Sequence, residues 1–165
     1  MDEGRIRELS YHEAGHPVAH HMLGTEFKCV HLRDSPHWTT MYEGDQRDPP
    51  TNRQELESRM IDAMAGDVAA GLFVENPKPS GQDVGNIESL VDRLNAAEDA
   101  EAFTTSMRNK TLELLDTPAN RRAIEALADH FYARAPRVGD EPRGVDVSYA
   151  DCVAIIDDAL NRDSP

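Results

Sequence analysis

Residues 10–24 read SYHEAGHPVAHHMLG, and this stretch decides how the N-terminal part of the chain folds. Apolar residues flank it at helical spacing, and Gly24 is a typical helix stop, so the pattern predicts a helix over about residues 3–23. On a helix, side chains four residues apart lie one above the other on the same face. We therefore expect His12 and His16 to point toward one place.

The segment His12–His16 has the pattern His-Glu-x-x-His, which is typical of zinc-dependent hydrolases. The pattern predicts that His12 and His16 bind a zinc ion, while Glu13 lies beside the metal without binding it. Glu13 can then act as the catalytic base, activating a zinc-bound water and later passing the proton to a leaving amine. The motif thus predicts hydrolysis of a peptide bond. The alternative is a histidine pair that binds no metal.

The next two histidines, His20 and His21, follow the motif directly. His20 is four residues after His16, whereas His21 turns away from that face. We interpret both as solvated helix residues rather than as ligands.

A catalytic zinc usually has three protein ligands and a water molecule, so one more ligand is expected outside the motif. The candidates are His31, His37, Asp67, Asp83 and His130. We favour Asp83, because it is expected in the first turn of a helix, where a rigid element holds it better than a loop holds His37. The alternative for Asp83 is a helix-capping carboxylate that binds no metal.

The composition favours a single acidic domain over residues 1–165. Acidic residues outnumber basic ones by 31 to 17, and the net charge of −14 argues against nucleic-acid binding. The sequence shows neither a signal peptide nor a long apolar run, so we expect a cytoplasmic protein that does not enter a membrane. Cys29 and Cys152 lie far apart in sequence and are expected to be free thiols.

The periodicity of the apolar residues predicts a mainly α fold, with about five to six helices and one small β-hairpin or sheet next to the His-Glu-x-x-His helix. We expect strands at residues 27–33 and 37–42 and a loop over residues 136–147. After the first helix, further helices are predicted after a cap at Thr51 or Asn52, from Asp83 to Leu94, from Asp99 to Leu115, after the Thr117 cap and after the Ser148 cap.

Two features near the predicted strands leave alternatives open. The segment Cys29–Leu32 is either an edge strand that pairs with an extended substrate or an ordinary core strand. Trp38 and Tyr42 either line a substrate pocket or pack in the core, and we favour packing.

Three segments, Ser10–His16, Gly66–Phe73 and Ser80–Val84, resemble the peptidase domain of the FtsH-type AAA+ zinc proteases. The likeness extends through Leu112–Leu115, Arg121–Ala128 and Val153–Ile156, and so covers nearly the whole chain. The first motif is highly specific, whereas the later ones are loose. The resemblance implies that His12, His16 and Asp83 bind Zn²⁺ and that Glu13 is the base.

The chain also departs from this family. The sequence contains no AAA+ ATPase module or membrane anchor, so we expect that it cannot unfold a protein substrate by itself. Pro17 replaces the family's alanine and removes an amide, which predicts a local kink. The family's acidic pair is Ala70-Gly71 here, which leaves Asp67 to orient a ligand. The turn before Asp83 is shorter, which makes Asn86 a weaker alternative ligand.

We therefore expect a zinc-dependent endopeptidase that hydrolyses accessible or unfolded peptides. The main alternative is a catalytically inactive binding or regulatory protein that keeps the fold and the zinc, and a third is an unrelated zincin that uses His31 or His37 as a ligand. The sequence leaves open the identity of the substrate, self-association of the chain, and an ATPase partner that acts in trans.

Overall fold

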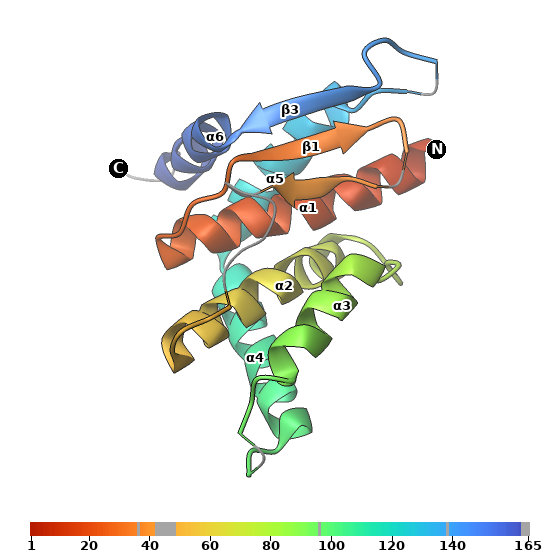
Figure 1. Cartoon of the computed structure of the whole chain (residues 1–165). Coiled ribbons are helices and arrows are strands. Elements are labelled where there is room, and N and C mark those ends of the chain that lie inside the picture. Colours follow the sequence, from red (N-terminus) through yellow and green to blue (C-terminus); the bar gives the residue numbers. More distant parts are fainter. Residues whose placement is uncertain (36, 42–48, 96, 138, 163–165) are drawn as a thin grey trace.

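The computed structural model describes residues 1–35, 37–41, 49–95, 97–137 and 139–162. Over these residues the chain forms six helices and one three-stranded antiparallel sheet, which confirms the predicted mainly α fold (Figure 1). The helices are α1 (Glu3–Leu23), α2 (Arg53–Phe73), α3 (Gly81–Val91), α4 (Ala100–Leu115), α5 (Pro118–Arg134) and α6 (Tyr149–Asn161).

The helices begin at side chains that cap them. The Asn52 carboxamide accepts the Glu55 amide before α2, and the Thr117 hydroxyl accepts the Asn120 amide before α5, as the sequence predicts. At the end of α1, Gly24 adopts φ = 65°, a left-handed conformation that favours glycine. α1 continues through the buried Pro17 as one helix.

The small sheet is present, as predicted, and contains one strand more than the two that were expected. Strands β1 (Cys29–Arg33) and β2 (Thr39–Met41) pair as expected, and β3 (Gly144–Ser148) adds to the other side of β1. The prediction of a loop over residues 136–147 is therefore wrong at its C-terminal end. This strand contains only two apolar residues in a charged surrounding, so its period-2 pattern is too short to stand out.

Strand β1 lies in the middle of the sheet, in the order β2-β1-β3. The alternative of Cys29–Leu32 as an edge strand is therefore wrong, and Val30 and Leu32 are fully buried core residues. Trp38 packs in the core, as predicted, and also borders a cavity that is described below. Its indole N–H donates to the carbonyl of Arg33 at 2.8 Å. Tyr42 lies outside the described residues.

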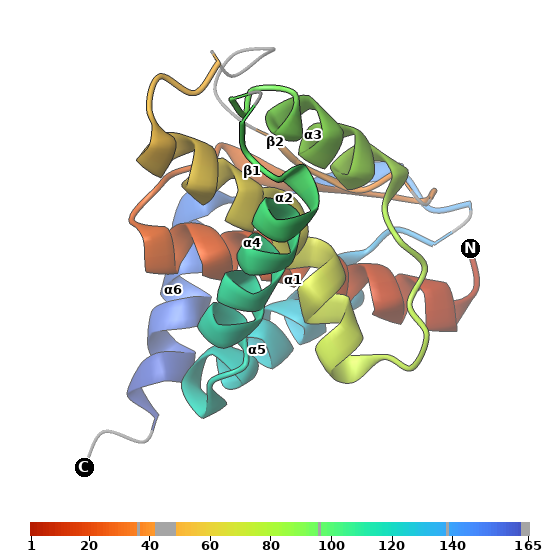
Figure 2. The same ribbon diagram turned by 90° about the horizontal axis from the view of Figure 1, so that it is seen from below.

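α1 is the central helix of the fold. It contacts β2 on one side and α2, α4, α5 and α6 elsewhere, and Figures 1 and 2 show it between the sheet and α2. Its residues Ile6, Leu9 and Val18 belong to the same core cluster as Met60 and Ile124. No helix in the described parts of the chain is long and apolar enough to cross a bilayer.

α1 and α2 approach each other unusually closely at two glycines. A Cβ atom on Gly15 of α1 would lie 2.3 Å from the carbonyl oxygen of Ala65 and 2.6 Å from Cβ of Ala69. A Cβ atom on Gly66 of α2 would lie 2.5 Å from Nε2 of His12. Both positions need glycine because the opposite helix occupies the space.

We predict that Gly15→Ala destabilises the protein by about 1–3 kcal/mol or more, because the added methyl group collides with backbone that cannot move freely. Gly71→Ala is a matched control on α2, where no atom of the described residues lies within 4 Å of the added methyl group. It is expected to raise stability by up to about 1 kcal/mol through helix propensity. Urea unfolding of both variants tests this. Equal stabilities for the two variants would contradict the close approach.

Candidate metal centre

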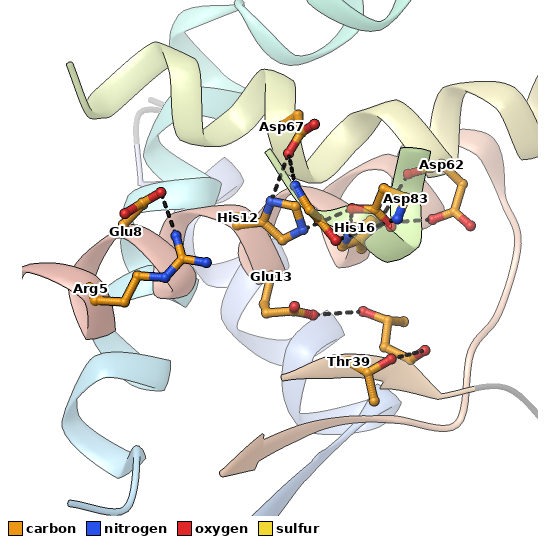
Figure 3. Close-up of polar contacts among 11 residues, drawn as sticks. Arg5, Glu8, His12, Glu13, His16, Thr39, Asp62, Asp67 and Asp83 are labelled. Atoms are coloured by element: carbon orange, nitrogen blue, oxygen red, sulfur yellow. Dashed lines mark hydrogen bonds and ion pairs between the residues drawn. The ribbon is translucent and has the colours of Figure 1, made fainter. Parts of the chain in front are cut away.

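Three buried side chains converge where α1, α2 and the start of α3 meet. His12, His16 and Asp83 each offer one ligand atom, and these atoms lie within 4.8 Å of one another. Oδ2 of Asp83 lies 2.9 Å from Nε2 of His12 and 3.8 Å from Nε2 of His16 (Figure 3). The two histidines come from one face of α1, as their spacing predicts. A cluster of this kind could hold a metal ion.

Asp83 reaches the cluster because of how α3 begins. Ser80 is the N-cap of α3, and its hydroxyl oxygen accepts the backbone amide of Asp83 at 3.4 Å. This places Asp83 in the first turn, as the sequence predicts, with its side chain buried. The alternative role of a simple capping carboxylate is filled by Ser80 instead.

Carboxylates of α2 orient both histidine rings. Nδ1 of His12 lies 3.3 Å from Oδ1 of Asp67, and Nδ1 of His16 lies 3.0 Å from the carbonyl oxygen of Asp62 and 3.3 Å from its Oδ1 (Figure 3). Carbonyl and carboxylate oxygens only accept hydrogen bonds, so each Nδ1 must carry the hydrogen. In the neutral ring, the lone pair is then on Nε2 and faces the cluster, which is the arrangement seen around metal sites.

The carboxylate oxygen of Asp83 supports a cation at this place. Oδ2 of Asp83 is buried and accepts no hydrogen bond from the described residues. Its contact with Nε2 of His12 is favourable only if a cation, either a proton or a metal ion, lies between the two atoms, because two lone pairs repel. Gly66 provides the room, since any side chain there would overlap both rings. The donor set and the space around it fit a metal ion.

The histidine pKa values show how strongly the site favours positive charge. Burial lowers the pKa of His12, but the close carboxylates of Asp67 and Asp83 outweigh burial and raise the pKa to about 10. Burial likewise lowers the pKa of His16, and the hydrogen bond to Asp62 together with the charge of Asp83 raises it to about 8. Without a metal, protons therefore take its place at neutral pH.

Asp62 connects the cluster to a third buried histidine. Oδ1 of Asp62 lies 3.1 Å from Nε2 of His20, and Nδ1 of His20 lies 2.7 Å from the Thr25 hydroxyl oxygen. Burial raises the pKa of Asp62, but hydrogen bonds to His16 and His20 hold it well below its usual range. The interpretation of His20 as a solvated residue is wrong, because its side chain is only 2% exposed.

Glu13 lies beside the cluster but is not part of it. Its Oε2 accepts a hydrogen bond from the Thr40 hydroxyl of β2 at 3.4 Å (Figure 3). Burial raises the pKa of the Glu13 carboxyl, and the charges of His16 and His12 only partly oppose this. A buried carboxylate with a raised pKa is a stronger base than an exposed one.

None of the other candidate ligands is a member of the described cluster. His31 pairs with Asp146 across β1 and β3, and His37 is exposed. His130 is on α5, and its Nε2 is buried without a hydrogen-bond partner among the described residues. Asn86 borders the space beside the cluster but is exposed. Asp67 contacts His12 and also accepts the backbone amide of Ser80 at 3.2 Å, so it joins α1, α2 and the approach to α3.

Sequence reasoning missed Asp62. The signal was present, because Asp62 is a single acidic residue within the apolar run Met60–Ala65 of a predicted core helix. A buried carboxylate in such a position needs a partner.

Comparison with known proteins adds no relationship. The chain matches no protein-family model and no curated protein sequence significantly.

We predict a graded loss of metal affinity in three variants. Asp83→Ala removes a ligand atom and should lower the affinity most, whereas Asp62→Asn weakens the orientation of His16 and should lower it by about 10- to 100-fold. His31→Ala should leave the affinity unchanged, because His31 lies outside the cluster. Competition with a chromogenic chelator measures all three. Equal metal retention by Asp83→Ala and the parent would remove Asp83 from the site.

Metal binding is also predicted to release protons. Below pH 8 both rings of the metal-free protein are protonated, and a metal ion needs them neutral, so affinity should rise with pH until about pH 10. Calorimetry in buffers of different ionisation enthalpy should find about two protons released at pH 7 and about one at pH 9. Affinity that does not change over this range would contradict the carboxylate-bound histidines.

Proposed function

We propose that the chain is a zinc-dependent endopeptidase that hydrolyses accessible or unfolded peptides. The observation that carries the proposal is the position of Glu13, whose buried carboxylate lies next to the His12, His16 and Asp83 cluster without joining it. A purely structural metal site has no need for such a group. The sequence resemblance to FtsH-type peptidase domains supports the same assignment.

Two histidine nitrogens and one carboxylate oxygen form a donor set that suits zinc and leaves a fourth position open. Closed structural zinc sites use four protein ligands, mostly cysteines. Both cysteines of this chain, Cys29 and Cys152, are buried and are not in the cluster. The ligand set therefore favours catalytic over structural zinc.

The chain's own residues can perform both proton transfers of peptide hydrolysis. Zinc, when bound, supplies a Lewis acid that acidifies water and polarises the substrate carbonyl. Glu13 takes a proton from the attacking water while the oxygen of this water bonds to the carbonyl carbon of the substrate. Glu13 then gives this proton to the nitrogen as the carbon–nitrogen bond breaks, which leaves a carboxylic acid and an amine; the acid's remaining water proton then passes to the amine or to solvent. Thr40 holds the Glu13 carboxylate through the hydrogen bond from β2.

The surroundings of the cluster suit an extended peptide. β2 is at an edge of the described sheet, and its residues Thr39 and Thr40 border the space around Glu13. An extended segment can pair with such an edge through backbone hydrogen bonds. A folded protein offers few extended segments, so unfolded or accessible peptides are the proposed substrates. An ATPase acting in trans would widen this range.

We predict that Glu13→Gln keeps zinc and fold but lowers the hydrolysis of unfolded casein and short apolar peptides by about 10²- to 10⁴-fold. Glu125→Gln on the exposed face of α5 is the matched control and should behave like the parent. Zinc content, circular dichroism and fluorogenic peptide assays measure the three properties.

The zinc-loaded parent decides between the two leading functions. Cleavage above the Glu13→Gln background supports the peptidase. Zinc binding without any such cleavage would instead favour the binding or regulatory protein, and Pro17→Ala would then test if the altered motif helix prevents activity. If the purified parent neither contains nor takes up a transition metal, the whole site assignment is wrong.

A further inference from the structure

A cavity of about 560 Å³ opens beside the candidate metal centre. His12 and Glu13 line both this cavity and the space around the cluster, and so do Trp38 and Ser80. A substrate group in this cavity would therefore belong to a residue next to the bond that is cleaved. The lining determines which residues are accepted there.

Basic side chains from three separate elements line this cavity. They are Arg5 of α1, Arg33 at the end of β1 and Lys78 in the segment before α3. The chain as a whole has 31 acidic and 17 basic residues and is therefore strongly negative. Three basic residues at one cavity differ from this average. Among the residues that the structure describes, the acidic members of the lining are Glu8 and Glu13.

The Glu8 carboxylate already has partners within the chain. It pairs with Nη1 of Arg5 at 2.5 Å (Figure 3). It also accepts the backbone amide of Lys78 at 2.5 Å. These contacts hold the Lys78 segment against α1. Glu13 is committed to the proposed chemistry, so neither carboxylate neutralises the other two cations.

Arg33 and Lys78 keep their charge available. Neither side chain forms an ion pair within the described parts of the chain. The backbone of Arg33 is fixed, because its carbonyl accepts the buried Trp38 indole N–H at 2.8 Å. Two unpaired cations beside a partly enclosed cavity favour an anionic group, and guanidinium suits a carboxylate best.

From this arrangement we infer that the enzyme prefers peptides that carry a carboxylate immediately beside the cleaved bond, held by Arg33 and Lys78. This inference rests on the proposed peptidase function and names its substrate class. The carboxylate has two sources, an acidic side chain within the peptide or the free C-terminus of a short peptide. The chemistry of recognition is the same for both, and the experiment separates them.

The first arm uses internally quenched, unstructured peptides blocked at both ends, identical except for Glu, Gln or Lys at each of four central positions. At one position, kcat/KM should be about tenfold higher for Glu than for Gln, and lowest for Lys. The second arm compares a neutral peptide with a free C-terminal carboxylate and its amide. A preference in the second arm alone would assign the pocket to the C-terminus. Raising the salt concentration should shrink either preference.

The double variant Arg33→Gln/Lys78→Gln should bring the Glu-to-Gln ratio close to one. Its matched control is Arg93→Gln/Arg108→Gln, which removes the same charge from exposed sites away from the cavity. The control should keep the parent's ratio. Zinc content and circular dichroism show that each variant is loaded and folded.

A binding measurement keeps the inference separate from the proposed function. The zinc-loaded Glu13→Gln protein is titrated with the Glu and Gln peptides by calorimetry, which needs no turnover. Tighter binding of the Glu peptide, lost in the triple variant with Arg33→Gln and Lys78→Gln, supports carboxylate recognition even if the parent shows no hydrolysis. Equal cleavage and equal binding of all peptides would overturn the inference and leave the peptidase standing. Absence of any peptide binding would overturn it as well.

Discussion

The close crossing of α1 and α2 is the constraint on which the site depends. Gly15 lets the backbone of α2 approach α1, and Gly66 leaves space for the rings of His12 and His16. Only at this separation can the carboxylates of Asp62 and Asp67 reach the Nδ1 atoms of those rings. The packing of two helices therefore sets the direction in which both Nε2 atoms point. A site built on two rigid helices keeps its geometry better than one built on loops.

The charge of the site follows from this packing. Two imidazoles lie among the carboxylates of Glu13, Asp62, Asp67 and Asp83, and all except Asp67 are almost fully buried. Buried carboxylates without a compensating cation are strongly unfavourable. The carboxylates raise the pKa of His12 to about 10 and that of His16 to about 8, so in the absence of a metal both imidazoles carry a compensating proton at neutral pH. A divalent metal would provide the same compensation with a single ion.

Local sequence signals predicted most of the fold and part of the site. The caps at Asn52, Thr117 and Ser148 act within one turn, so the sequence alone located those helix starts. The i, i+4 spacing put His12 and His16 together for the same reason, and Asp83 was expected at a helix start. The partners of β3 and His20 could not be predicted in this way, because they are distant in sequence. β3 pairs with a strand more than 100 residues away, and His20 contacts Asp62 only because α1 packs against α2. Periodicity carries no information about such distant pairs.

The short helix α3 links the candidate metal cluster to the wall of the neighbouring cavity. The buried side chains of α3 are Asp83 and Leu90, Ile87 and Val91 pack half-buried against the core, and Val84 is 42% exposed. One of these buried side chains, Asp83, is the candidate ligand itself. A bound metal ion would therefore stabilise the packing of α3 by joining Asp83 to the two histidines of α1. Removing the metal with a chelator would break this connection. The segment from Ser80 to Gln82, which forms one wall of the cavity, would then be held less firmly. The shape of the cavity and the occupancy of the cluster would then be linked, because both depend on how firmly the start of α3 is held.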